Sequence, residues 1–277
     1  MGGLGGGGGI PIPIPAGLGG GGVLIVVLIF LALQFFGGGG STGSSLDGLG
    51  GQTGVQPGTS VDLSNNGDMV EFMGAVADDA NDLWTDTFQR SGQQYQRAVL
   101  VLFTGSTVSG CGPASSETGP FYCPADQKVY LDTDFFKELS NRFGAPGDFA
   151  QAYVIAHEVG HHVQNLLGVS DRVHAARAHQ SKVEANRESV KLELQADCLA
   201  GVWAFHANRT RKLLEPGDVD EGLRAATAIG DDTLQRQARG RVVPESFTHG
   251  SSQQRVQWFK TGMNSGRVED CDTFAAM

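Results

Sequence analysis

Residues 153–167 read YVIAHEVGHHVQNLL and contain an H-E-x-x-H motif at residues 157–161. Apolar residues recur through this stretch at the three- and four-residue spacing of a buried helix face. Asp148 before the stretch is a typical N-cap residue, and Gly168 after it is a typical helix terminator. Together these signals predict one helix that starts at Asp148 and ends near Gly168.

The two histidines of the motif, His157 and His161, are suited to bind one metal ion. A helix advances about 100° per residue, so residues four apart share a face. Two such imidazoles supply half of a tetrahedral zinc site. Glu158 projects beside them and can take a proton from the attacking water. His162 lies about 140° around the helix from His157 and is expected to pack or to hydrogen-bond. The alternative is a surface helix of ordinary composition, against which the apolar stripe argues.

A catalytic zinc ion requires a third protein ligand and an open position. The pattern H-E-x-x-H-x-x-G-x-x-H is excluded, because Gln164 and Leu167 stand where it needs glycine and histidine. Glu193 is the expected third ligand, and Asp197, one helical turn later, is expected to accept the spare N–H of a ligand imidazole. A solvated acidic face is the alternative, but the flanks of this second helix are apolar, where an unpaired carboxylate is costly. Three other histidines compete for the role of ligand: His174, His179 and His206.

Five stretches of the chain resemble the bacterial neutral zinc metallopeptidases of the YpfJ type, a membrane-anchored family with a zincin-like domain. They are GPFYCPADQKVYLD (119–132), QAYVIAHEVGHHVQ (151–164), LELQADC (192–198), IGDD (229–232) and FTHGSSQQRVQWF (247–259). The resemblance implies a peptidase-like zinc site and does not imply a particular substrate. In zincin-like folds a strand before the active-site helix often pairs with extended substrate, and Val129–Asp132 is the strand expected here to do so.

We expect an α+β, mainly helical fold: a zincin-like metallopeptidase domain with a small β-sheet, preceded by one transmembrane helix. A polar segment from Asp171 to Glu188 is expected to form an exposed helix or lid. Helices are predicted at Met69–Gln89, Asp218–Ile229 and Ser251–Phe259, and strands at Arg97–Phe103 and Lys128–Leu131.

Composition divides the chain into four regions. Residues 1–22 are rich in glycine and proline and are expected to lack a core. Residues 23–36 form the core of a predicted transmembrane helix spanning about residues 17–36, although a signal peptide is the alternative. Residues 37–66 are expected to form a Gly/Ser-rich linker, and residues 67–277 are expected to form the zinc metallopeptidase domain. The net charge of −10 argues against a nucleic-acid partner.

The four cysteines suit two disulfides, Cys111–Cys123 and Cys198–Cys271, although the sequence allows three pairings. Disulfides favour an oxidising compartment, so we expect a single-pass protein of the bacterial cell membrane with its catalytic domain outside the cytoplasm. The positive-inside rule cannot be applied to this orientation, because no lysine or arginine precedes Arg90. The alternative is four reduced cysteines in a cytosolic domain.

His249 is a candidate donor to the oxyanion that develops during peptide hydrolysis, and a structural cap of the following helix is an equal alternative. Weaker candidates for the same role are Tyr153, Tyr130 and Arg255. The expected activity is hydrolysis of peptide bonds with Zn²⁺, with Glu158 as general base. A non-catalytic anchored scaffold that keeps the zinc site, and a zinc hydrolase acting on cell-wall material, are the alternatives.

Overall fold

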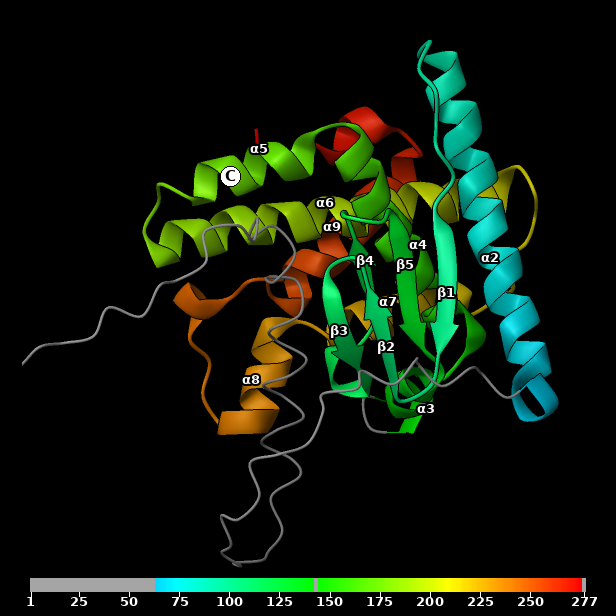
Figure 1. Cartoon of the computed structure of the whole chain (residues 1–277), viewed down its shortest axis with the longest axis horizontal. Coiled ribbons are helices and arrows are strands. Elements are labelled where there is room, and N and C mark those ends of the chain that lie inside the picture. Colours follow the sequence, from blue (N-terminus) through cyan, green and yellow to red (C-terminus); the bar gives the residue numbers. More distant parts are fainter. Residues whose placement is uncertain (1–62, 142–143, 276–277) are drawn as a thin grey trace, which may run out of the picture.

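The computed structural model describes residues 63–141 and 144–275 (Figure 1). The predicted N-terminal region 1–22, the membrane span 17–36 and most of the linker 37–66 lie outside the described residues. In the described part of the chain, no helix combines the length and the hydropathy needed to cross a bilayer.

The described residues form the mainly helical α+β fold that the sequence predicts. The helices are α2 (Leu63–Arg90), α3 (Thr133–Asn141), α4 (Asp148–Leu166), α5 (Val169–Arg177), α6 (Lys182–Arg209), α7 (Asp218–Ala228), α8 (Asp231–Arg239) and α9 (Ser252–Ser265). The strands are β1 (Val99–Phe103), β2 (Ser106–Ser109), β3 (Gly112–Ser115), β4 (Phe121–Cys123) and β5 (Lys128–Asp132).

Several predicted boundaries need correction. Asp148 is not an N-cap: it is the first residue of α4, and the glycine before it takes the cap position. Asp218 is likewise the first residue of α7 and follows a glycine cap. An acidic side chain in the first turn is still favourable there because it faces the positive end of the helix dipole. The polar segment 171–188 is not one helix but lies in α5 and the first part of α6. Helices α3 and α8 span only nine residues each, too few to give a clear periodic signal.

The prediction that Val129–Asp132 offers an edge to substrate is wrong for Val129 and Tyr130. The strand order is β1-β5-β4, so β5, which contains these residues, is the central strand of its sheet. It pairs in parallel with β1 along its whole length and antiparallel with β4 through residues 128–130, so both of its edges are occupied along residues 128–130. The sequence predicts a strand at Lys128–Leu131, but it does not predict the partners of that strand, because β4 has only three residues.

Helix α4 is the centre of the molecule. It packs against the sheet, α2, α6 and α7, and it is buried along most of its length. A helix covered on so many sides must be apolar around most of its circumference, as this sequence is. In Figure 1, α2 flanks the sheet on the β1 side and α8 lies on the opposite side of the molecule. The largest buried side chains of this core include Trp84, Tyr153, Phe259, Met73 and Leu131.

Both predicted disulfides are present. Cys111–Cys123 ties the β2–β3 hairpin to β4, and Cys198–Cys271 ties α6 to the C-terminal segment. The second bond closes a loop with a sequence separation of 73 residues. In the chain-entropy account, closing a loop of this length stabilises the fold by about 4 kcal/mol.

Helices α6 and α9 approach so closely that only glycine fits at their crossing. A Cβ atom on Gly201 would lie 2.1 Å from the carbonyl oxygen of Phe259, and one on Gly262 would lie 1.9 Å from that of Cys198. These contacts are with backbone atoms, which cannot rotate away as a side chain can. The crossing fixes α9 against the C-terminal half of α6, a few residues beyond Glu193.

We expect Gly262→Ala to destabilise the protein by about 1–3 kcal/mol or more, because the methyl group forces the helices apart. Gly74→Ala in α2 is the matched control. No atom lies within 4 Å of the added Cβ there, so the change should be neutral or stabilise by up to about 1 kcal/mol. Urea unfolding of the two variants checks the prediction, and equal midpoints would contradict it.

Candidate active site

Helices α4 and α6 bring together the two histidines and the glutamate singled out in the sequence. One nitrogen each of His157 and His161 and one oxygen of Glu193 lie within 4.8 Å of one another, and all three residues are buried. Gly160, inside the motif, permits this approach, because a Cβ there would lie 3.1 Å from the carbonyl oxygen of Ala196 on α6. The motif therefore supplies both the side chains and the close helix packing that they need.

The geometry of this group fits a zinc ion. Oε2 of Glu193 lies 3.2 Å from Nε2 of His157 and 3.6 Å from Nε2 of His161. Ligand atoms about 2.0–2.1 Å from a tetrahedral zinc ion lie about 3.3–3.4 Å from one another. Nε2 of His161 is also buried without a hydrogen-bond partner among the described residues. Two imidazoles and a carboxylate are a common donor set for catalytic zinc.

Neighbouring side chains orient both imidazoles. Nδ1 of His161 lies 2.9 Å from Oε1 of Gln164, whose own amide donates to the carbonyl oxygen of Leu192. Since the amide oxygen accepts, Nδ1 of His161 carries the proton, and Nε2 keeps its lone pair for a metal ion. Nδ1 of His157 lies 2.9 Å from Oδ1 of Asp197, and both side chains are buried. Asp197 thus lies where the sequence analysis expects it, and the role of Gln164 is a feature that analysis missed.

Asp197 is the centre of a buried polar network. Arg255 donates from Nε to Oδ2 of Asp197 over 2.8 Å and from Nη2 to Oδ1 over 2.9 Å, and the hydroxyl of Tyr153 also donates to Oδ1. Burial raises the pKa of Asp197, but Arg255 and His157 outweigh burial and hold it at about 2. For His157, burial acts to lower the pKa. The negative charge of Asp197 outweighs burial and raises the pKa of His157 to about 9.

Glu158 lies in the same pocket without a partner. Glu158 is 5% exposed, and its Oε2 atom is buried without a hydrogen bond to any described residue. Burial raises the pKa of this carboxyl above its ordinary value, while His161 and His157 act in the opposite direction. A buried carboxylate that binds no protein group is available to accept a proton from water.

His249 reaches the pocket from the loop between α8 and α9. Its neighbours on the loop side are Oγ1 of Thr248, 3.2 Å from Nδ1, and Oδ1 of Asp231, 3.5 Å from Nδ1. Burial lowers the pKa of His249, and the charges of Glu193 and Asp231 outweigh it, so the pKa is raised. Nε2 has no hydrogen-bond partner among the described residues. Of the candidate oxyanion donors that line the pocket, His249 alone has a ring or side-chain nitrogen that makes no hydrogen bond to a described residue.

The other candidates are engaged elsewhere. Tyr153 and Arg255 are committed to Asp197, and the hydroxyl of Tyr130 donates to Asp126. His162 is buried, with Nδ1 3.0 Å from the hydroxyl of Tyr122 and Nε2 2.6 Å from the carbonyl oxygen of Gln96, as expected of a structural histidine.

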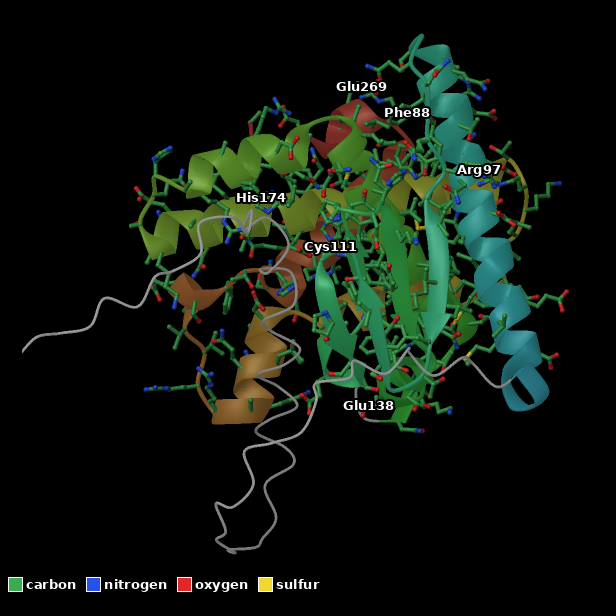
Figure 2. The ribbon with its side chains drawn as sticks, viewed as in Figure 1. Phe88, Arg97, Cys111, Glu138, His174 and Glu269 are labelled. Carbon is green, nitrogen blue, oxygen red and sulfur yellow. A yellow bond between two sulfur atoms is a disulfide. The ribbon has the colours of Figure 1, made fainter. Side chains whose placement is uncertain are left out.

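None of the competing histidines belongs to the group of potential metal ligands. His174 projects from α5 (Figure 2). His206 contacts the carbonyl oxygen of Gly266 with Nε2, and His179 lies in the turn before α6. The described chain has one other group of acidic residues close enough to hold a cation, made of Asp148, Asp218 and Glu221, and it is partly exposed.

The remaining pocket walls are apolar. They are formed by side chains from the start of β4, from α3 and α4, and from the junction of α7 with α8: Pro120, Phe135, Val154, Ile229 and Leu234. Among the described residues that line the pocket, Arg255 is the only cationic side chain apart from the histidines, and it is paired with Asp197.

The fold and the site together define a class: mainly helical α+β proteins in which an H-E-x-x-H helix meets a glutamate from a second helix. Within this class, the chain belongs to the family described as "Putative neutral zinc metallopeptidase", whose model matches residues 1–274. The resemblance seen in the sequence is thereby confirmed.

Two relatives illustrate the similarity. The chain is 50% identical over 210 residues to the protein named "Uncharacterized protein YpfJ" of Escherichia coli strain K12, covering 76% of this chain and 73% of that protein. It is also 50% identical over 192 residues to "Uncharacterized protein Rv2575" of Mycobacterium tuberculosis, covering 66% of this chain and 64% of that protein. No solved structure gives a significant match.

Proposed function

We propose that this protein is a membrane-anchored, zinc-dependent peptidase that hydrolyses peptide bonds. One observation carries the proposal: Oε2 of Glu158, buried without a hydrogen-bond partner among the described residues, lies in one pocket with the buried group His157, His161 and Glu193. That combination supplies a base beside a place for a metal ion. Membership of a zinc metallopeptidase family supports the same activity.

His157, His161 and Glu193 would hold the zinc ion. When bound, zinc supplies Lewis-acid polarisation of the scissile carbonyl and lowers the pKa of water. Glu158 accepts the proton of the attacking water and then delivers it to the leaving amine. The N–H of His249 donates to the carbonyl oxygen as negative charge develops on it. Asp197 and Gln164 keep the two imidazoles turned toward the metal position.

The apolar walls support a preference in the substrate. A peptide side chain next to the scissile bond would lie against Leu234, Ile229 and Val154, and Arg255 is not free to pair with an acidic side chain. We therefore propose cleavage beside an apolar residue, because burying a charged one in such walls is costly.

The location is part of the proposal. The uncharged apolar run at 23–36 supports a single membrane anchor, and the disulfides Cys111–Cys123 and Cys198–Cys271 support a catalytic domain outside the cytoplasm.

The experiment measures zinc content of the purified full chain together with hydrolysis of an unbiased peptide library. We expect one zinc ion per chain and chelator-sensitive cleavage with an apolar residue at the cleaved bond. Zinc binding without cleavage would contradict the peptidase proposal and would favour the scaffold or a substrate from the cell wall. Absence of zinc after metal reconstitution would overturn the metal site itself.

Replacing Glu193 with alanine should lower the affinity for zinc by at least about tenfold, because one of three protein ligands is lost. Equilibrium competition with a chromogenic chelator measures the change. Glu188→Ala is the matched control. Glu188 lies on the same helix but pairs with Lys191 over 3.0 Å and is not one of the potential metal ligands. Equal zinc affinity in the two variants would remove Glu193 from the ligand set.

A further inference from the structure

Asp231, the first residue of α8, holds the loop that carries His249. Its Oδ2 accepts hydrogen bonds from the backbone N–H groups of Thr248 and His249, both over 2.8 Å, and of Gly250 over 3.0 Å. Its own backbone N–H donates to the carbonyl oxygen of Gly250 over 2.9 Å. Asp231 is 2% exposed, so water competes little for these bonds. Hydrogen bonds to an ionised, buried acceptor are among the strongest in proteins.

Three successive N–H groups can converge on one oxygen only if the backbone curls around it. Gly250 permits this shape, because its φ of +94° lies in the region that side-chain-bearing residues rarely adopt. Gly250 also lies against α6. A Cβ atom added to Gly250 would lie 3.2 Å from the side chain of Leu194 and 3.3 Å from that of Val190. The loop is therefore fixed to α8 by charge and to α6 by close packing.

The same carboxylate also lies beside the imidazole of His249. Oδ1, the oxygen not used by the loop, lies 3.5 Å from Nδ1 of His249. Nδ1 thus faces Asp231 and Thr248, which leaves Nε2 as the nitrogen available to the pocket. The adjacent Asp232 makes no such contact: its Oδ1 accepts from the backbone N–H and the hydroxyl of Ser252, both over 2.7 Å.

We propose that Asp231 is a positioning residue, which holds the His249 loop and turns Nε2 of His249 toward the scissile carbonyl. The proposal rests on the proposed function, in which His249 is the oxyanion donor. It assigns a role to the first aspartate of the IGDD stretch at 229–232, which lies in the sequence well away from the H-E-x-x-H helix. Asp231 acts through His249 and does not touch the substrate.

Asp231→Asn separates positioning from folding. The amide oxygen of asparagine can still accept from the loop N–H groups, while its NH₂ group replaces the oxygen that faces His249. Because misplacing a catalytic group or losing one oxyanion donor costs about 10²-fold or more, we expect kcat to fall at least tenfold with KM little changed. Asp232→Asn, which alters the neighbouring carboxylate and not the His249 loop, is the matched control and should leave kcat unchanged.

A double-mutant cycle then tests whether the effect passes through His249. In a His249→Ala background, Asp231→Asn should cause no further loss of kcat, because the group that it positions is already absent. Equal losses in both backgrounds, or an unchanged kcat in the single variant, would overturn the proposal.

A second readout is independent of catalysis. The ¹⁵N chemical shifts of the His249 ring, identified by their absence in His249→Ala, should change in Asp231→Asn and not in Asp232→Asn. Identical ring shifts in wild type and Asp231→Asn would overturn the contact. If wild type binds zinc but cleaves no peptide, the proposed function fails, and the ring shifts alone decide whether Asp231 holds His249.

Discussion

Replacing Glu158 with glutamine is expected to lower kcat by about 10²–10⁴-fold, the usual contribution of general acid–base catalysis. Glutamine matches glutamate in shape but cannot accept the proton of water. The effect should be near the upper limit, because Glu158 has no hydrogen-bond partner among the described residues and its raised pKa makes it a better base. KM should change little, since the amide fills the same space.

The glutamine variant must keep its zinc for this result to be interpreted. Glu158 points beside the ligand group and is not part of it, so one zinc ion per chain should remain. Metal analysis of the same samples used for kinetics checks this. Retained zinc with unchanged kcat would exclude Glu158 as the base, whereas loss of zinc would show that Glu158 contributes to metal binding.

The sequence predicts the site best where its chemistry is local. His157, His161 and Glu158 lie within one helical turn, so helix geometry alone relates them. Glu193 could be selected because a buried carboxylate in an apolar helix needs a partner. Its approach to the histidines then depends on Gly160, whose packing against Ala196 is visible only in the structure.

Features that depend on contacts between distant parts of the chain could not be predicted from the local sequence. Gln164 stands where the longer zinc motif needs glycine, and nothing in the local sequence shows that it contacts His161. Asp231 contacts residues 17 to 19 positions later, and no local pattern relates them. Arg255 was considered as an oxyanion donor, but its partner Asp197 lies 58 residues earlier in the chain. The position of β5 in the sheet could not be predicted for the same reason, since strand order is set by pairing between separate segments.

Replacing Arg255 with methionine should destabilise the zinc-free protein by about 3–5 kcal/mol, because it leaves a charged partner buried. The Arg255 side chain is 3% exposed and that of Asp197 is 0% exposed, so water cannot replace the lost ion pair. Arg267→Met is the matched control. Arg267 pairs with Asp270 over 2.6 Å, but its side chain is 67% exposed, so water can replace the ion pair and its loss should change stability little. Urea unfolding at neutral pH measures both, and similar losses would contradict the prediction.

The same substitution should change how stability depends on acid. An aspartate in an unfolded chain titrates near pH 3.9, whereas Arg255 and His157, acting against burial, hold the pKa of Asp197 at about 2. A carboxyl whose pKa is lower in the folded state stabilises the fold above pH 4, and this contribution, about 2–3 kcal/mol, is lost as the pH falls toward 2. Without Arg255, the pKa of Asp197 rises and most of this loss disappears. Unfolding measured between pH 5 and pH 2 should therefore show a shallower decline in Arg255→Met than in wild type, while Arg267→Met should follow wild type. Parallel curves for Arg255→Met and wild type would mean that Arg255 does not set the charge state of Asp197.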